Sequence, residues 1–228
     1  MTVTDTIHEN LRIPTGGAEL EADIHVPPRA LGVVLFAHGS GSSRLSPRNI
    51  FVAEQLQQAG LATVLVDLLT PTEEQIDRRT PKLRFDIPML AARLVALTEW
   101  ITQHDSTAEK PTGLFGASTG AGGALIAAAA RPVLVSTVVS RGGRPDLASD
   151  FLYLVRQPVL LVVGQHDGPV IELNRRAREK LRGEARLEIV PGATHLFEEP
   201  GTLEQVAMLA RHWFVDQMQT EEPHLSTR

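Results

Sequence analysis

Cysteine is absent from the 228 residues of this chain. Its absence excludes disulfides, a thiolate nucleophile and cysteine-based metal sites. Basic tracts are also lacking and the formal net charge is -5, so we expect no nucleic-acid partner. No apolar run approaches the roughly 20 residues that a membrane-spanning helix needs. Residues 1–10 are polar and carry acids, unlike a signal peptide, so a cytoplasmic protein that does not bind membranes is predicted.

Spacings typical of metal ligands are missing as well. There is no H-x-x-H motif and no histidine–carboxylate cluster at ligand spacing, so we predict no metal and no cofactor. The composition itself is ordinary for a globular protein, with 43% hydrophobic and 21% charged residues. Without linkers or repeats, residues 1–228 are predicted to form one domain, and homo-oligomerisation is left open.

Apolar runs and helical patterns alternate along the chain after a hairpin at 11–26. This alternation predicts an α/β fold, with a mostly parallel sheet of about seven or eight strands and helices on both faces. The remaining strands are expected at 32–37, 62–66, 112–115, 133–139, 158–163 and 186–190. Helices are expected at 49–59, 87–102, 124–130, 147–155, 169–181 and 203–218. Residues 68–84 are polar and aperiodic and are expected to form a long loop, often a functional feature.

A G-x-S-x-G motif stands between the strand at 112–115 and a run of small helical residues. Its members are Gly116, Ser118 and Gly120. A strand–turn–helix of this kind holds a nucleophilic serine clear of the sheet edge, and glycine fills the crowded flanking positions. The pentapeptide alone does not distinguish this from a glycine-rich turn with an idle serine. Partners elsewhere in the chain must decide.

Functional groups of parallel α/β sheets lie at the carboxyl ends of the strands. Ser118, Asp167 and His195 all follow predicted strands, in the order expected after a nucleophile elbow. A serine hydroxyl needs a base to take its proton, and histidine suits this role because its pKa lies near neutrality. The histidine in turn needs a carboxylate that fixes its tautomer. The three residues are therefore candidates for a catalytic triad.

Other residues compete for these roles. His166 is the main rival base, but it precedes Asp167 on the same short turn and could hardly face it with good geometry. Asp146 and Asp67 are rival acids. We favour a helix cap for Asp146 and a strand-end turn for Asp67.

The chain resembles proteins of the α/β-hydrolase fold and, within that fold, the dienelactone-hydrolase-like family. The segments that carry the resemblance are 38–43 (HGSGSS), 116–120 (GASTG), 164–167 (GQHD) and 192–197 (GATHLF). The resemblance implies the three triad roles already argued. It also implies an oxyanion hole formed by the backbone N–H groups of Ser40 and Thr119. In related folds a cap is commonly inserted after the strand that follows the elbow helix; here only residues 140–145 separate the strand at 133–139 from the next predicted helix, so we expect no cap domain.

Two departures from the family pattern limit what the resemblance implies. Dienelactone hydrolases carry cysteine at the elbow, where this chain has Ser118. They also carry an arginine shortly after the histidine that holds a substrate carboxylate, and residues 196–201 contain none. The resemblance therefore implies the fold and the reaction class, and it does not establish dienelactone as the substrate.

These observations favour a serine hydrolase that cleaves carboxylic esters or related small acyl compounds through an acyl-enzyme. The alternatives are acyl transfer or amide or thioester cleavage by the same triad, and a non-catalytic scaffold that binds ligands. Arg44 and Arg141 follow strand ends at the same rim, so either could bind an anionic substrate group. Surface ion pairs are the competing interpretation for both arginines. The 68–84 segment is expected to cover the site if anything does.

Overall fold

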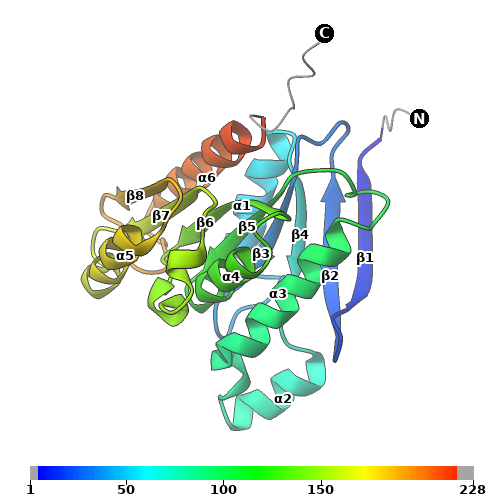
Figure 1. The fold of residues 1–228 in the computed structure, drawn as a ribbon, viewed down its shortest axis with the longest axis horizontal. Coiled ribbons are helices and arrows are strands. Elements are labelled where there is room, and N and C mark those ends of the chain that lie inside the picture. The colour runs from blue at the N-terminus through cyan, green and yellow to red at the C-terminus, as the bar shows by residue number, and fades with distance from the viewer. Residues whose placement is uncertain (1–4, 220–228) are drawn as a thin grey trace.

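The computed structural model describes residues 5–219 and contains one eight-stranded sheet (Figure 1). The strands lie in the order β1-β2-β4-β3-β5-β6-β7-β8. Their bounds are β1 Ile7–Pro14, β2 Glu19–Val26, β3 Val33–Ala37, β4 Ala62–Val66, β5 Thr112–Ala117, β6 Val135–Arg141, β7 Val159–Gly164 and β8 Ala185–Val190. Strand β2 of the antiparallel β1–β2 hairpin pairs with β4 in antiparallel direction. The strands β4, β3, β5, β6, β7 and β8 are all parallel to one another. The predicted α/β architecture is confirmed.

Helices cover both faces of the sheet (Figure 1). Helices α1 (Pro47–Gln58) and α6 (Thr202–Gln219) pack on one face. Helices α3 (Ile87–Ile101), α4 (Thr119–Ala130) and α5 (Gly168–Lys180) pack on the other. Strands β3 and β4 are buried along their whole length, which explains why they are continuous apolar runs. In residues 5–219 no helix is long and apolar enough to cross a membrane.

The 68–84 segment is not the loop that its polar sequence suggested. It contains α2 (Pro71–Arg79) and a 3₁₀ turn, η1 (Leu83–Phe85). The side chain of Thr70 accepts a hydrogen bond from the N–H of Glu73, and the Glu73 carboxylate accepts one from the N–H of Thr70. This capping box starts a helix that has little apolar periodicity, so hydrophobic spacing could not reveal it.

The segments around the predicted strand at 133–139 also differ from expectation. The predicted helix at 147–155 is a pair of 3₁₀ turns, η2 (Pro145–Ala148) and η3 (Leu152–Leu154). Strand β6 begins and ends two residues later than predicted, so Arg141 is its last residue. Only Gly142, Gly143 and Arg144 separate β6 from η2, which leaves no room for a cap domain at this point.

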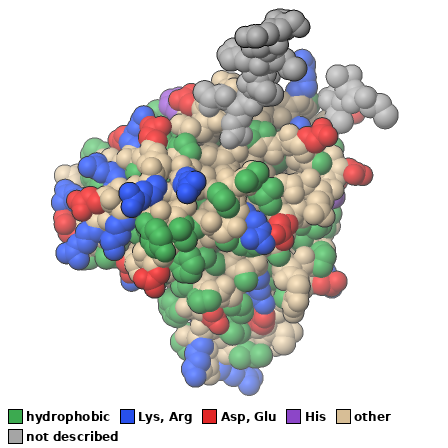
Figure 2. Space-filling view, in the orientation of Figure 1, with side chains coloured by type: hydrophobic (Ala, Val, Ile, Leu, Met, Phe, Trp, Pro, Cys, Tyr) green, Lys and Arg blue, Asp and Glu red, His purple; other side chains and the backbone are tan. Residues whose placement is uncertain are grey.

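Charged side chains are spread unevenly over the surface. Figure 2 shows Lys and Arg gathered at the end of the molecule where α5 and β8 lie. Sequence agrees with the picture, since α5 carries Arg175, Arg176, Arg178 and Lys180. This basic end belongs to the outer strand β8 of the sheet, whereas the G-x-S-x-G motif lies on the central strand β5.

Candidate active site

Ser118 occupies a sharp turn between β5 and α4. Its φ of 50° and ψ of -119° place it in backbone space that residues with a side chain rarely adopt. Strand β6 and the residues after it hold this conformation: the Ser118 N–H donates to the carbonyl of Arg141 (3.1 Å), and the N–H of Arg144 donates to the carbonyl of Ser118 (3.0 Å). The Ser118 side chain therefore projects from a backbone that is fixed on both sides.

The glycines of the motif are required by crowding. A Cβ on Gly116 would lie 2.4 Å from the Cα of Ala121, and a Cβ on Gly120 would lie 2.2 Å from the carbonyl oxygen of Ala37. Both distances are shorter than any side chain tolerates, so the turn cannot form with larger residues at these positions. The motif is thus a built elbow rather than an incidental glycine-rich turn.

Ser118, His195 and Asp167 form a hydrogen-bonded chain. His195 Nε2 lies 3.3 Å from Ser118 Oγ, and His195 Nδ1 lies 2.6 Å from Asp167 Oδ2. The carboxylate can only accept, so Nδ1 carries a proton and Nε2 is left free to accept the serine proton. The structure thus brings together the three residues that the order along the chain singled out, in the arrangement of a nucleophile, its base and an orienting acid.

The turn that carries His195 is held by a carboxylate that sequence reasoning missed. Glu199 accepts hydrogen bonds from the Thr194 N–H (3.1 Å) and the Thr194 hydroxyl (2.6 Å). These bonds from Thr194 hold the pKa of Glu199 below its usual value. The N–H of His166 donates to the carbonyl of Ala193 (2.9 Å), which ties this turn to the one that bears Asp167.

The rival acids and base have other partners or positions. Asp146 does not cap a helix, which corrects our expectation; it forms two hydrogen bonds with the guanidinium of Arg144 (2.8 and 2.7 Å). His166 is exposed, and His195 takes the carboxylate of Asp167. Asp67 follows β4 as expected, and its carboxylate binds Arg44.

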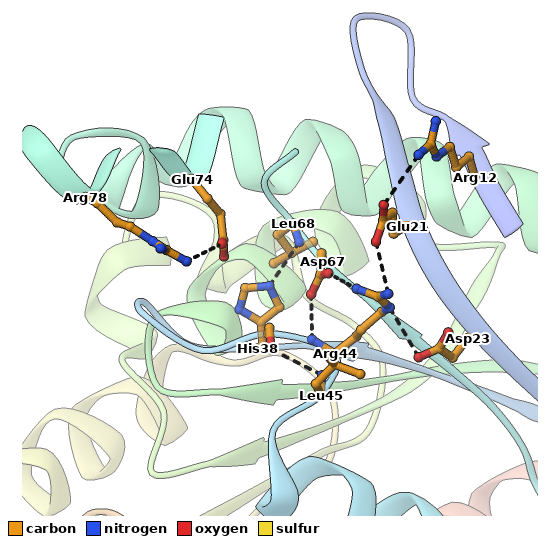
Figure 3. Close-up of polar contacts among 11 residues, drawn as sticks. Arg12, Glu21, Asp23, His38, Arg44, Leu45, Asp67, Leu68, Glu74 and Arg78 are labelled. Carbon is orange, nitrogen blue, oxygen red and sulfur yellow. Dashed lines mark hydrogen bonds and ion pairs between the residues drawn. The ribbon is translucent and has the colours of Figure 1, made fainter. Parts of the chain in front are cut away.

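Arg44 lies against three carboxylates, which favours the ion-pair interpretation, while its role in substrate binding stays a prediction. Its guanidinium pairs with Glu21 (3.0 Å), with Asp23 (3.2 Å) and with Asp67 (Figure 3). Its backbone N–H also donates to Asp67 (2.6 Å). Together the three carboxylates fasten the 38–44 loop to β2 and to the end of β4. No carboxylate in residues 5–219 pairs with Arg141, the other arginine candidate.

The loop after β3 carries the expected oxyanion residue. His38 is buried; its Nδ1 donates to the carbonyl of Gly39 (2.9 Å), and its Nε2 accepts from the N–H of Leu68 (2.9 Å; Figure 3). Burial lowers the pKa of His38 and favours the neutral ring that this pair of bonds requires. The N–H of Ser40 points to the elbow, where it donates to the hydroxyl of Thr119 (2.8 Å).

A pocket of about 180 Å³ opens beside the Ser40 loop. One wall is the loop itself, the floor is formed by Leu68, Leu69 and Leu90, and the opposite wall is formed by side chains of α2 and η1. The 68–84 segment, largely as a helix, thus lines the pocket beside the Ser40 loop, and that it covers the active site stays a prediction.

Comparisons with known proteins agree with this geometry. A family model described as alpha/beta hydrolase fold matches residues 32–186. Proteins from two Mycobacterium tuberculosis strains, provisionally named phosphoribosyl transferases, are 54% identical over 92% of this chain and 46% of their own length. The chain therefore spans about half the length of the curated relatives it matches.

Solved structures define the family more closely. A dienelactone hydrolase from Anabaena variabilis has a TM-score of 0.91 and 55% identity, covering 93% of this chain and 98% of that one. Est1E from Butyrivibrio proteoclasticus has a TM-score of 0.78 over 92% of this chain and 99% of that one; at 16% identity, this likeness shows the fold alone. The chain belongs to the α/β-hydrolase family and, within it, to the dienelactone-hydrolase-like proteins.

Proposed function

We propose that this protein is a serine hydrolase that cleaves carboxylic esters or related small acyl compounds through an acyl-enzyme. The observation that carries the proposal is the chain of hydrogen bonds from Ser118 Oγ through His195 to Asp167, built on a strained elbow. A non-catalytic scaffold would not need to hold serine at a φ of 50° against a histidine.

Each residue has a defined step in this mechanism. Ser118 Oγ attacks the acyl carbon while His195 Nε2 takes its proton, and Asp167 stabilises the imidazolium that forms. The negative charge that develops on the carbonyl oxygen faces the N-terminus of α4, where the N–H of Thr119 has no acceptor within the helix. The imidazolium then gives its proton to the departing alkoxide. Water, activated by the same histidine, releases the acid and restores Ser118.

The relatives support hydrolysis more directly than transfer of a phosphoribosyl group. The dienelactone hydrolase from Anabaena variabilis matches over nearly its whole length, whereas more than half of each Mycobacterium relative lies outside the match. We therefore assign acyl chemistry to this chain and leave its relatives' phosphoribosyl transferase name to be tested separately.

Acyl transfer, or amide or thioester cleavage, is the second candidate, because the same triad performs each of these reactions. The cytoplasmic location and the single domain over 1–228 stay predictions.

The first test combines a covalent probe with a substrate panel. A fluorophosphonate should label the peptide that contains Ser118, and 4-nitrophenyl esters of increasing acyl length should define the preferred size. Ser118→Ala should lower kcat by about 10³–10⁶, as removal of a triad member does in other hydrolases. Ser149→Ala, at an exposed serine in the connection after η2, is the matched control. Labelling elsewhere, or a Ser118→Ala variant that keeps most of its activity, would refute the assignment.

Product analysis separates the second candidate from the first. With an alcohol or amine added as a competing acyl acceptor, a hydrolase releases mainly free acid. Predominant formation of the transferred ester or amide would favour acyl transfer.

A further inference from the structure

The turn after β6 touches both the proposed nucleophile and the proposed base. Residues 142–144 form this turn, and the N–H of Arg144 donates to the carbonyl of Ser118 (3.0 Å). A Cβ on Gly142 would be 3.2 Å from the carbonyl oxygen of His195 and 3.5 Å from two atoms of the imidazole ring. A shift of this turn would therefore change the 3.3 Å separation between His195 Nε2 and Ser118 Oγ.

The turn has little stiffness of its own. Gly142 adopts a left-handed φ of 51°, and a Cβ on Gly143 would be 1.9 Å from Ser140 Oγ and 2.7 Å from the Cβ of Ala121. Both positions favour glycine, which has the greatest backbone freedom of any residue. The N–H of Gly142 is fixed by the carbonyl of Val162 (2.8 Å). The peptide that follows requires a tie of its own.

Asn174 supplies this tie from α5. Its side-chain Nδ2 donates to the carbonyl of Gly143 (3.0 Å) and to the carbonyl of Val170 (2.8 Å), one turn back in the same helix. Both acceptors are carbonyl oxygens, so the amide nitrogen must face them. Asn174 is 0% exposed, so water does not compete for these bonds. The side chain thus holds the Gly143 carbonyl beside α5.

Helix α5 also begins at the proposed acid. Asp167 directly precedes the helix, and its carbonyl accepts the N–H of Ile171 (3.0 Å) in the first turn. Asn174 lies about two helical turns further along. One helix therefore carries the amide that holds the turn against His195 and starts at the carboxylate that bonds to the Nδ1 of that histidine.

Stability alone does not account for an amide at this position. Asn174 Oδ1 is buried and has no hydrogen-bond partner, which destabilises the folded state. The other buried residues of α5, Val170 and Ala177, are apolar. A leucine would have about the same size and would leave no unpaired acceptor on the helix. What leucine could not supply is the donor to Gly143.

We propose that Asn174 is a positioning residue for the reaction: it holds residues 142–144 against His195 and so keeps the imidazole within reach of Ser118 Oγ. The inference rests on the proposed hydrolase function. Asn174 acts through the turn and does not touch the substrate. Its loss should affect the chemical step far more than substrate binding, because proton transfer depends on the geometry between Ser118 and His195.

The first test measures kcat, KM and the melting temperature together. Asn174→Leu should lower kcat by about 10- to 100-fold, the effect of moving a reacting group by about 1 Å, and should change KM by less than about threefold. Asn174→Asp keeps the shape but places an acceptor against the Gly143 carbonyl, so it should lose at least as much. If Asn174→Leu does not fold, Asn174→Ser replaces it, because the shorter hydroxyl turns to its own helix.

Gln157→Leu is the matched control. Gln157 is another buried amide, 6% exposed, and its Nε2 donates to the carbonyl of Ala128 (2.8 Å), at the end of α4 opposite to the elbow. This variant should lower the melting temperature and leave kcat unchanged at temperatures where the protein is folded. A kcat that falls equally in Asn174→Leu and Gln157→Leu would make Asn174 a merely structural residue and overturn the proposal.

The pH profile distinguishes positioning from stability. The acid limb of kcat/KM reports the protonation of His195. If the turn loosens, the bond between His195 and Asp167 weakens and the imidazolium is stabilised less, so this limb should move to lower pH in Asn174→Leu. Gln157→Leu should leave the limb in place. An unmoved limb in Asn174→Leu would refute a role in positioning the histidine.

A double variant tests the route of the effect. Gly142→Ala places a methyl group against His195 and so disturbs the same contact directly. If Asn174 acts through the turn, Asn174→Leu/Gly142→Ala should be little worse than Gly142→Ala alone. Losses in kcat that multiply would show that Asn174 acts elsewhere, and the proposal would fail.

Proton NMR separates this inference from the proposed function. The Nδ1 proton between His195 and Asp167 gives a low-field signal that requires no substrate. If the wild type hydrolyses no ester, but Asn174→Leu changes this signal and Gln157→Leu does not, the hydrolase proposal fails and the positioning role stands. If esters are hydrolysed and the signal is the same in all three proteins, the positioning role fails and the hydrolase stands.

Discussion

The backbone N–H of Ser40 donates a hydrogen bond of 2.8 Å to the hydroxyl oxygen of Thr119. These are the two residues that the family resemblance assigns to the oxyanion hole, and the bond joins the loop after β3 to the first residue of α4. Sequence reasoning considered only their backbone groups. The structure adds the Thr119 side chain, which orients the Ser40 N–H and carries a hydroxyl proton of its own beside Ser118.

Thr119→Val should therefore lower kcat by about tenfold, because the acceptor that orients a transition-state donor is lost. Thr119→Ser keeps the hydroxyl and should stay close to wild type. Ser40→Pro removes the N–H itself and should cost about 10²–10³ in kcat. Steady-state kinetics on one 4-nitrophenyl ester would test all three variants. Equal activities for Thr119→Val and Thr119→Ser would restrict the oxyanion hole to backbone groups.

The choice of acid is tested by two matched amide substitutions. Asp167→Asn should lower kcat by about 10³–10⁴, because an amide no longer fixes the tautomer of His195. Asp146→Asn should leave kcat nearly unchanged, since Asp146 bonds to Arg144 rather than to the histidine. The decisive measurement is kcat for both variants on the same ester. A larger loss for Asp146→Asn would mean that the acid has been misassigned.

Helix α2 should depend on the ion pair between Glu73 and Arg93. Arg93→Met leaves Glu73 without its cation and the Leu68 carbonyl without a donor. Because the Glu73 side chain is 24% exposed, we expect a loss of about 1–3 kcal/mol in the free energy of unfolding, below the value for a fully buried pair. Urea unfolding measures this loss, and limited proteolysis should find new cleavage sites in α2. Arg175→Gln, which breaks an exposed pair on α5, is the control and should change neither.

The free energy of unfolding should decrease as the pH falls, because the folded protein disfavours protonation of His38. Burial depresses the pKa of the folded ring below the usual histidine value of 6.5, more strongly than the hydrogen bond to Gly39 and the charges of Asp67 and Glu74 raise it. Below about pH 6.5 the unfolded chain takes up a proton that the folded chain refuses, so stability decreases as pH falls through this range. His38→Gln should be less stable than wild type at pH 7.5 but should lose less on going to pH 5.5. Melting temperatures at the two pH values would test this, and an unchanged difference would rule out His38 as the source.

The short α2 and the absence of a cap domain predict that the enzyme acts on soluble esters. No cap domain follows β6, and the pocket beside Ser40 is bounded by the short α2 and η1. We expect activity on soluble short-chain esters at ordinary rates, with no need for a lipid surface. Rates measured across the critical micelle concentration of a lipid ester would test this; a sharp rise above it would indicate a lid that opens at interfaces.

The sequence by itself determined the elbow, the alternation of strands and helices apart from α2, and the three candidate triad residues. Each depends on local chemistry: glycines where a Cβ would collide with Ala37 or Ala121, buried strands written as apolar runs, and polar residues at the strand ends. Parallel strands bring such ends to one edge, so their chemistry could be combined without coordinates. The capping box of α2 was also present in the sequence, but a polar helix gives no periodic signal that would draw attention to it.

Only the tertiary structure decided what depends on partners distant in sequence. Arg44 and Arg141 looked alike as rim arginines, yet Glu21 and Asp23 reach one of them across the sheet and no carboxylate in the described residues reaches the other. The same holds for the Thr119 hydroxyl, whose bonding partner lies 79 positions earlier in the chain. Whether a polar group is satisfied is set by the atoms that folding brings within about 3 Å of it, and spacing along the chain does not encode those atoms.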